Sequence, residues 1–188
     1  MHEDYDRLNI LRPDHAGHVL GETLIEKGHA YVASNGDVMY SVASFEPYGK
    51  LSGKRLADLR AGARIEVEDA KRDPLDFVLW KMAKPGVPSW DSPWGAGRPG
   101  WHIECSVMSG EVLGFPFDIH TGGIDHREIH HPNEIAQNQA FCCTNGLDDP
   151  RNSGAKIWMH NNFLVERSGK MSKSSGEFMR LQLLIDRG

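Results

Sequence analysis

Apolar positions at helical and strand spacings divide the first part of the chain into short elements. Residues 1–30 carry leucines at helical spacing, and Pro13 is expected to split this helix, because the residue before a proline avoids helical geometry. Residues 30–42 contain two short runs rich in valine and tyrosine around Asn35 and Gly36. Asn-Gly between apolar runs strongly favours a tight turn, so this segment predicts a β-hairpin.

The next apolar positions predict a helix, a strand and a long connection. Residues 49–64 intersperse basic side chains with leucines and predict a short basic amphipathic helix, and residues 77–81 predict an apolar strand. Residues 84–100 hold four prolines, four glycines and two tryptophans, which fits either a linker or an ordered loop held by its tryptophans. We therefore place a boundary near residue 84, between an inserted α+β module (1–84) and a second unit (85–188).

Helices and strands alternate after residue 100. The pattern predicts helices over 102–112 and 132–145, strands over 117–120 and 157–160, and a loop over 165–176 before a final helix. Strands separated by helices of this length indicate a parallel sheet, so the predicted fold class is α/β with a smaller α+β insertion module. Ligands bind beyond the carboxyl ends of such strands, where His120 and His160 fall.

Composition narrows the class of protein further. The 188 residues carry 21 basic and 26 acidic side chains, a net charge of −5, which argues against indiscriminate nucleic-acid binding but leaves room for a local basic patch. No apolar run approaches the ~20 residues that span a bilayer, and no signal peptide is recognisable. Three cysteines, an odd number, indicate a reducing cytosol. Ten histidines are present, six of them between His102 and His160.

The first group with candidate chemistry comprises Cys105, His130 and Glu134. A thiolate, an imidazole and a carboxylate are good Zn²⁺ ligands, and three protein ligands leave one position open. We expect Pro132 in the first turn of a helix and His130 just before it, so that reach rather than helical spacing brings His130 and Glu134 together. A buried structural cysteine beside surface histidines explains the spacing equally. The adjacent Cys142-Cys143 pair lacks the spacing of a zinc knuckle and predicts one core and one partly exposed thiol.

Two further motifs are candidates for nucleotide binding. Lys170, Ser172 and Lys173 lie in a Lys-Ser-rich run that ends at Gly176, and such a run forms either a mobile polyphosphate-binding loop or a solvated basic turn. Gly122 and Gly123 directly follow a predicted strand, where glycine lets a ligand approach the backbone. Asp125 could accept hydrogen bonds from a ribose or an amine, although an ordinary turn explains this segment as well.

These motifs resemble those of one known family. Residues 170–174 read Lys-Met-Ser-Lys-Ser, which resembles the KMSKS signature of class I aminoacyl-tRNA synthetases. Residues 100–108 are similar to the segment that supplies a zinc-binding cysteine in cysteinyl-tRNA synthetases. Further similarity to that family lies in residues 9–13, 27–32, 76–81, 118–125 and 130–137. The resemblance therefore covers nearly the whole chain and follows the family's order.

The resemblance implies a Rossmann-like catalytic fold and a role for each motif. One Zn²⁺ per subunit would be held by Cys105, His130 and Glu134 with an upstream cysteine, and Trp101 and His102 would line the amino-acid pocket. The residues implied for ATP binding are His120, Gly122, Gly123, Asp125, Ser172 and Lys173, and Lys170 and Lys173 are the implied catalytic lysines. The implied reaction joins cysteine to tRNA-Cys with ATP and Mg²⁺. The implied enzyme is a cytoplasmic monomer without membrane contact.

Departures from the family pattern qualify this reading. The His-Ile-Gly-His signature does not occur, and the first cysteine is Cys105. We therefore expect a central fragment, the insertion module plus the second half of the catalytic domain, which is inactive alone and lacks the anticodon-binding domain. Two alternatives remain: a related ligase that joins cysteine to an aminosugar–inositol, and a non-catalytic zinc-binding module. The long insertion and the basic residues near Lys54 favour the tRNA enzyme.

Overall fold

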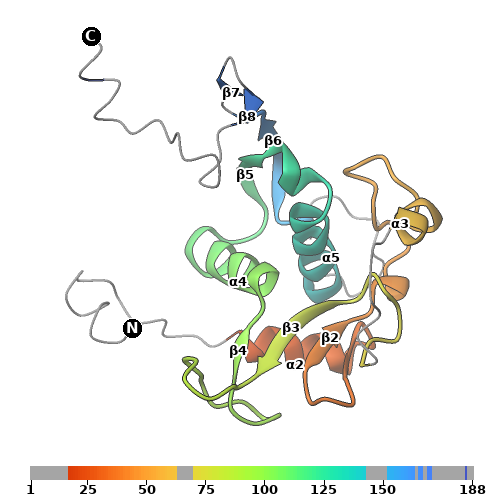
Figure 1. Ribbon diagram of the computed structural model, residues 1–188, viewed down its shortest axis with the longest axis vertical. Coiled ribbons are helices and arrows are strands. Elements are labelled where there is room, and N and C mark those ends of the chain that lie inside the picture. Colours follow the sequence, from red (N-terminus) through yellow and green to blue (C-terminus); the bar gives the residue numbers. More distant parts are fainter. Residues whose placement is uncertain are drawn as a thin grey trace.

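A computed structural model describes residues 17–62, 70–142, 152–163, 165–166, 169–170 and 185. Its first part is a four-stranded antiparallel sheet in the order β1-β2-β3-β4, with one helix, α2 (His18–Glu26), packed against it (Figure 1). The described part of the predicted N-terminal helical segment is thus helical. Residues 1–16, including Pro13, lie outside the description.

The predicted hairpin is confirmed. β1 (Ala30–Val32) pairs with β2 (Val38–Tyr40), and Gly36 in the connecting turn has a φ of 88°, a left-handed conformation that suits glycine. The predicted helix over 49–64 is wrong in its first half, because α3 covers only Leu56–Gly62. Gly49 and Gly53 have φ values of 88° and 72°, which a right-handed helix cannot include, so this segment forms turns.

The Pro/Gly-rich segment is an ordered loop rather than a linker. β3 (Phe77–Met82) pairs with β2 on one side and with β4 (Gly97–Pro99) on the other. The loop between β3 and β4 is held by an isolated bridge between Trp90 and Gly97, and by Trp94, whose ring lies 6.3 Å from that of Trp80. The sheet therefore extends past residue 84, and the division into two domains there stays a prediction.

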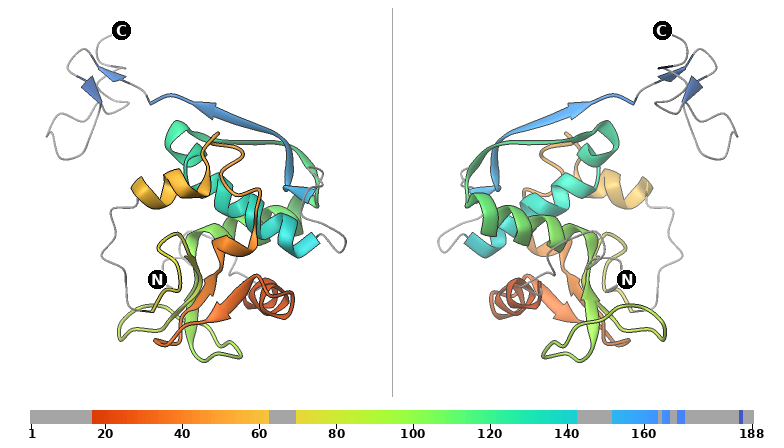
Figure 2. Two further views of the ribbon diagram at one scale, coloured as in Figure 1. Left: turned by 90° about the vertical axis from the view of Figure 1, so that its right-hand side faces the viewer. Right: turned by 90° about the vertical axis from the view of Figure 1, so that its left-hand side faces the viewer.

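The alternating helix–strand pattern after residue 100 is confirmed. α4 (Trp101–Leu113), β5 (Phe117–Gly123), α5 (His130–Cys142) and β6 (Ala155–Asn161) follow in order, with a short 3-10 helix, η2 (Ile124–Arg127), before α5. β5 and β6 are parallel, in a register that places Ile119 beside Ile157. α4 and α5 lie between the antiparallel sheet and the β5–β6 pair (Figure 2).

Two boundaries differ from the predictions and bear on the site. β5 continues to Gly123, so His120 lies within the strand rather than at its end. α5 begins at His130 and not after it, because Pro132 needs no backbone donor in the first turn of a helix. His130 and Glu134 therefore stand one helical turn apart on the same helix.

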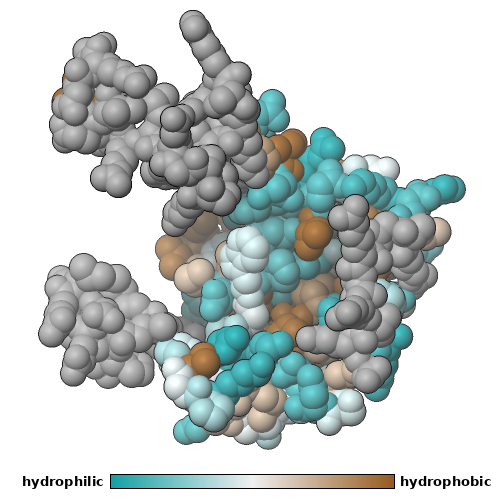
Figure 3. Space-filling view, in the orientation of Figure 1, coloured by the Kyte–Doolittle hydropathy of each residue, from teal (hydrophilic) through white to brown (hydrophobic). Residues whose placement is uncertain are grey.

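One apolar core joins the two parts of the fold. Leu24 of α2, Leu79 and Trp80 of β3, Ile103 of α4 and Ala136 of α5 belong to a single buried cluster. The face in Figure 3 is mainly hydrophilic with apolar patches. Within the described residues, no helix combines the length and the apolar composition needed to cross a bilayer.

The segment with the Lys-Ser run is only partly described. Val165–Glu166 (β7) and Gly169–Lys170 (β8) form a short antiparallel pair, and the backbone of Lys170 lies in β8. Ser172, Lys173, the predicted final helix and Cys143 lie outside the described residues. Cys142, the last residue of α5, is partly exposed.

Candidate metal centre

Polar side chains fill the buried surface of α5, which is unusual for a helix at the centre of a fold. His130, His131, Asn133 and Glu134 are each at most 5% exposed, and Gln137 is fully buried. Buried polar groups are costly unless they are paired. The amide of Gln137 donates to Ser106 Oγ of α4 at 3.0 Å, and Tyr48 donates its hydroxyl proton to Asn133. The helix is thus held by polar contacts, which a purely structural helix would not need.

A close backbone approach fixes the start of α4. Gly100 donates its backbone N–H to the carbonyl of Leu79 at 2.8 Å, and a Cβ at this position would overlap the Val78 carbonyl. Only glycine fits here, and the next two residues, Trp101 and His102, emerge beside β3. His102 packs its ring edge-to-face against Phe77, with centroids 5.4 Å apart.

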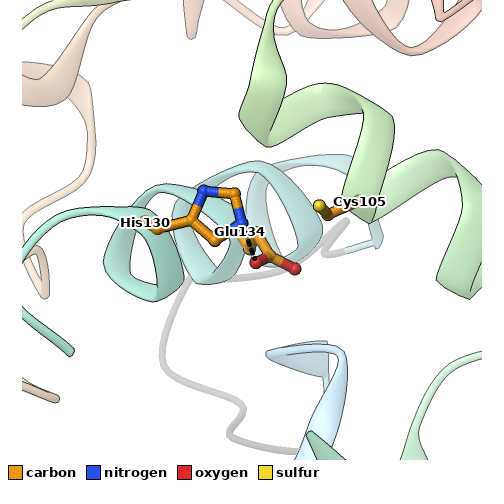
Figure 4. A group of neighbouring side chains, drawn as sticks. All are labelled: Cys105, His130 and Glu134. Carbon is orange, nitrogen blue, oxygen red and sulfur yellow. Dashed lines mark ion pairs between the residues drawn. The ribbon is translucent and has the colours of Figure 1, made fainter. Parts of the chain in front are cut away.

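Cys105, His130 and Glu134 come together between α4 and α5. Cys105 projects from α4 towards the two side chains of α5 (Figure 4). The ligand atoms of the three residues lie within 4.8 Å of one another, and Nε2 of His130 is 3.0 Å from Oε1 of Glu134. The structure therefore brings together the three residues that the sequence offered as zinc ligands.

The donor set fits a metal ion. Oε1 of Glu134 is buried without a hydrogen-bond partner, although His130 Nε2 is only 3.0 Å away. The two atoms are close but not aligned as donor and acceptor. A thiolate, an imidazole nitrogen and a carboxylate oxygen gathered within 4.8 Å of one another suit Zn²⁺. Without a cation beside it, Oε1 of Glu134 is a buried acceptor whose lost hydration nothing replaces.

The second oxygen of Glu134 belongs to a neighbouring histidine cluster. Nε2 of His120 donates to Oε2 at 2.9 Å, and His131 stacks on His120 with ring centroids 4.6 Å apart. His131 also contacts His160, with 2.8 Å between Nδ1 and Nε2. His120, His131 and Glu134 form a second group with metal-ligand spacing. Glu134 thus lies between two groups, and its unpartnered oxygen faces the one with Cys105.

Burial governs the protonation of these side chains. Desolvation, followed by the carboxylates of Glu134 and Glu104, raises the pKa of Cys105 to about 11. Desolvation lowers the pKa of His102 to about 4, and the nearby charge of His130 adds to the effect. For Glu134 desolvation opposes ionisation, but the contacts with His120 and His130 outweigh it and hold the pKa of the carboxyl below its usual value. The carboxylate is therefore ionised and ready to bind a cation.

The other predicted site residues lie at different distances from this group. The exposed ring of Trp101 stacks on His130 at 4.2 Å, so Trp101 and His102 both adjoin the metal group. A cavity of about 620 Å³ opens beside His102 and is also lined by Phe77 and Asn133. Gly122 is needed where it stands, because a Cβ would lie 2.8 Å from the ring of His131. Asp125 is exposed in η2.

Sequence reasoning missed several members of the site. His131, Asn133 and Gln137 are buried polar residues of α5, and His131 contacts both His120 and His160. The available signal was the composition of residues 130–139, which have polar side chains on every face of the predicted helix. Apart from a narrow stripe of small apolar residues that includes Ala136 and Ala140, such a helix buries polar side chains, and these need polar partners.

Together these features define an α/β protein in which Cys105, His130 and Glu134 form a group that could hold a metal ion, where a parallel strand pair meets two helices. Residues 1–187 match the family described as the tRNA synthetases class I (C) catalytic domain, and the chain belongs to that family.

Curated relatives agree with this assignment. A cysteine–tRNA ligase of Novosphingobium aromaticivorans is 67% identical over 163 residues, which cover 85% of this chain and 32% of the relative. Those of Thioalkalivibrio sulfidiphilus and Methylococcus capsulatus are each 54% identical over 196 residues, which cover 100% of this chain and 41% and 40% of the relatives. The chain therefore spans between 32% and 41% of the length of these three relatives.

Proposed function

We propose that this chain is the part of a cysteine–tRNA ligase that recognises cysteine through a zinc ion. The proposed reaction activates cysteine with ATP to the adenylate and transfers it to tRNA-Cys. The observation that carries the proposal is the Cys105–His130–Glu134 group, with its unpartnered carboxylate oxygen, in a chain of this family. Zinc, the nucleotide and the tRNA are proposals that rest on this group and on the relatives.

The proposed metal site explains why a cysteine side chain would be selected. Cys105, His130 and Glu134 would hold the ion and leave a position open for the substrate. Bound zinc supplies a thiophilic ion that binds the thiolate of cysteine much better than the hydroxyl of serine. Trp101 lies over His130 and would form an apolar wall beside the substrate. His102, on the same side, would complete the amino-acid pocket.

The remaining predicted residues would serve the nucleotide. Gly122 and Gly123 at the end of β5 would let ATP approach the backbone, and His120 and Asp125 would adjoin the adenylate. Lys170, Ser172 and Lys173 would bind the phosphates as the cysteine carboxylate attacks the α-phosphorus and pyrophosphate leaves, and Mg²⁺ would neutralise the phosphate charge. We expect a monomer in the cytoplasm.

A metal titration tests the site. The chain should bind one Zn²⁺ or Co²⁺, and the Co²⁺ form should show a thiolate-to-metal absorption band. Cys105→Ser should remove the band, whereas Cys142→Ser, at a partly exposed thiol at the end of α5, should retain it. Binding that is unaffected by changes at Cys105, His130 and Glu134 would refute the assignment.

A chimera tests the reaction. This chain would replace the matching segment of the Thioalkalivibrio sulfidiphilus ligase, with which it is 54% identical over its full length. The chimera should catalyse cysteine-dependent ATP–pyrophosphate exchange and charge tRNA-Cys, and the chain alone should do neither. Transfer to an aminosugar–inositol instead of tRNA would favour the related ligase. Zinc binding with no activation by the chimera would favour a non-catalytic module.

A further inference from the structure

His102 and His130 meet through their Nδ1 atoms, which lie 2.6 Å apart. A hydrogen bond between two ring nitrogens requires that one carries a proton and the other offers a lone pair. The contact therefore has two forms, and each fixes the position of the proton on His130. They differ in whether Nε2 of His130 is free to bind a metal ion.

The opposite edge of the His130 ring distinguishes the two forms. If His102 were the donor, neutral His130 would carry its proton on Nε2, next to Oε1 of Glu134 at 3.0 Å. With a proton on Nε2, that nitrogen could not bind a metal ion. A metal ion held by Cys105, His130 and Glu134 needs the lone pair of Nε2, because Nδ1 of His130 is turned to His102. In the metal-bound protein the proton of His130 therefore belongs on Nδ1.

We propose that His102 is a positioning residue that holds His130 in the tautomer with its proton on Nδ1, so that Nε2 presents its lone pair to the metal. This inference rests on the metal centre proposed above. In this arrangement His102 accepts, through its own Nδ1, the hydrogen bond that His130 donates. His102 is therefore not itself a metal ligand. Histidine ligands generally use their second ring nitrogen in this way, and the partner fixes both tautomer and ring orientation.

The ring of His102 is itself held by the antiparallel sheet. Phe77 of β3 presses against it edge-to-face at 5.4 Å, and Phe77 in turn stacks on Tyr40 of β2 at 4.9 Å. Tyr40 donates its hydroxyl proton to the carbonyl of Ala136 in α5, at 3.1 Å. A chain of contacts thus runs from the sheet through His102 to the proposed ligand.

Two substitutions separate the acceptor function of His102 from its bulk. His102→Asn can place its side-chain oxygen near the position of Nδ1 and keep the acceptor. His102→Phe fills the space beside Phe77 but cannot accept a hydrogen bond. His29→Asn serves as the control, because the ring of His29 contacts Ser44 and Tyr40 rather than His102 or the three proposed ligands.

The experiment measures the dissociation constants of Co²⁺ and Zn²⁺ for the full chain and its variants, together with the thiolate-to-Co²⁺ band. His102→Phe should weaken binding about 10- to 100-fold, and His102→Asn should recover most of that loss. His29→Asn should leave the dissociation constant unchanged. Long-range ¹H–¹⁵N correlation spectra of the Zn²⁺-bound wild type should place the proton of His130 on Nδ1.

The results distinguish the inference from the proposed function. Wild-type binding that persists unchanged in His102→Phe would overturn the role of His102 and leave the metal centre standing. Binding of Zn²⁺ through Nδ1 of His130 in the wild type, with the proton on Nε2, would overturn the tautomer assignment, whether or not the variants fold. No binding by the wild type would overturn the metal centre itself, and the role of His102 with it.

Discussion

The buried carboxylate of Asp76 should contribute strongly to the stability of the antiparallel sheet that it adjoins. It is 1% exposed and lies immediately before Phe77, which contacts His102. Its Oδ2 accepts the hydroxyl proton of Tyr31 at 2.7 Å and the backbone N–H of Asp73 at 3.2 Å. Its Oδ1 accepts the backbone N–H of Val42 at 3.0 Å.

The expected effect follows from these three bonds. A hydrogen bond to a charged acceptor contributes about 1.5–3 kcal/mol, but bonds that share one acceptor are less than additive. We expect Asp76→Ala to lower the free energy of unfolding by about 4 kcal/mol, out of roughly 5–15 kcal/mol for an ordinary domain. At about 2–4 °C per kcal/mol, the midpoint of thermal unfolding should fall by roughly 8–16 °C. Asp76→Asn keeps the shape and part of the acceptor, so its effect should be about half as large.

Urea and thermal unfolding, followed by circular dichroism, measure these differences. The matched control is Asp58→Ala, because Asp58 is exposed and pairs with Arg55, three residues before it, at 3.0 Å. Exposed pairs of this kind contribute about 0–1 kcal/mol. A loss in Asp76→Ala no larger than in Asp58→Ala would refute the argument from the buried bonds.

Three further predictions follow from the structure. Gly122→Ala should lower the free energy of unfolding in urea by about 1–3 kcal/mol. The added methyl group would lie 2.8 Å from His131 and 2.9 Å from His126. A free energy of unfolding equal to that of the wild type would contradict this packing. Burial is the first cause that raises the pKa of Tyr31 to about 12, and it also raises the pKa values of Tyr40 and Tyr48. The unfolded chain therefore loses these protons first, and the free energy of unfolding should fall as the pH rises from about 10 towards 12; phenolate absorbance at 295 nm checks the titration, and a flat profile would count against the burial. Saturation with Zn²⁺ at 100 times its dissociation constant should stabilise the chain by about 2.7 kcal/mol, and a chelator should reverse this in the wild type, whereas Cys105→Ser should respond to neither.

The elements of the fold were largely predictable because their signals are local. Asn35-Gly36 specified the hairpin turn, and the alternation after residue 100 specified two helices and a parallel strand pair. The prediction was wrong over 49–55, where the leucine spacing favoured a helix. Gly49 and Gly53 adopt left-handed conformations there, and glycine permits this without requiring it. The pairing of Gly97–Pro99 with β3 was also beyond local reasoning, because it joins segments across a long loop.

The amino-acid sequence by itself supplied the residue types of the site: a cysteine, a histidine and a glutamate with the chemistry of zinc ligands. Only the tertiary structure decided that their ligand atoms lie within 4.8 Å of one another and that Oε1 of Glu134 has no other partner. It also decided that His102, 28 residues before His130, meets it through Nδ1. Spacing along a helix follows from the periodicity of one segment, but the meeting of α4, α5 and β3 depends on how the whole core packs. A sequence pattern can therefore indicate which residues could be ligands, and the packing of the fold determines which of them meet and how they are oriented.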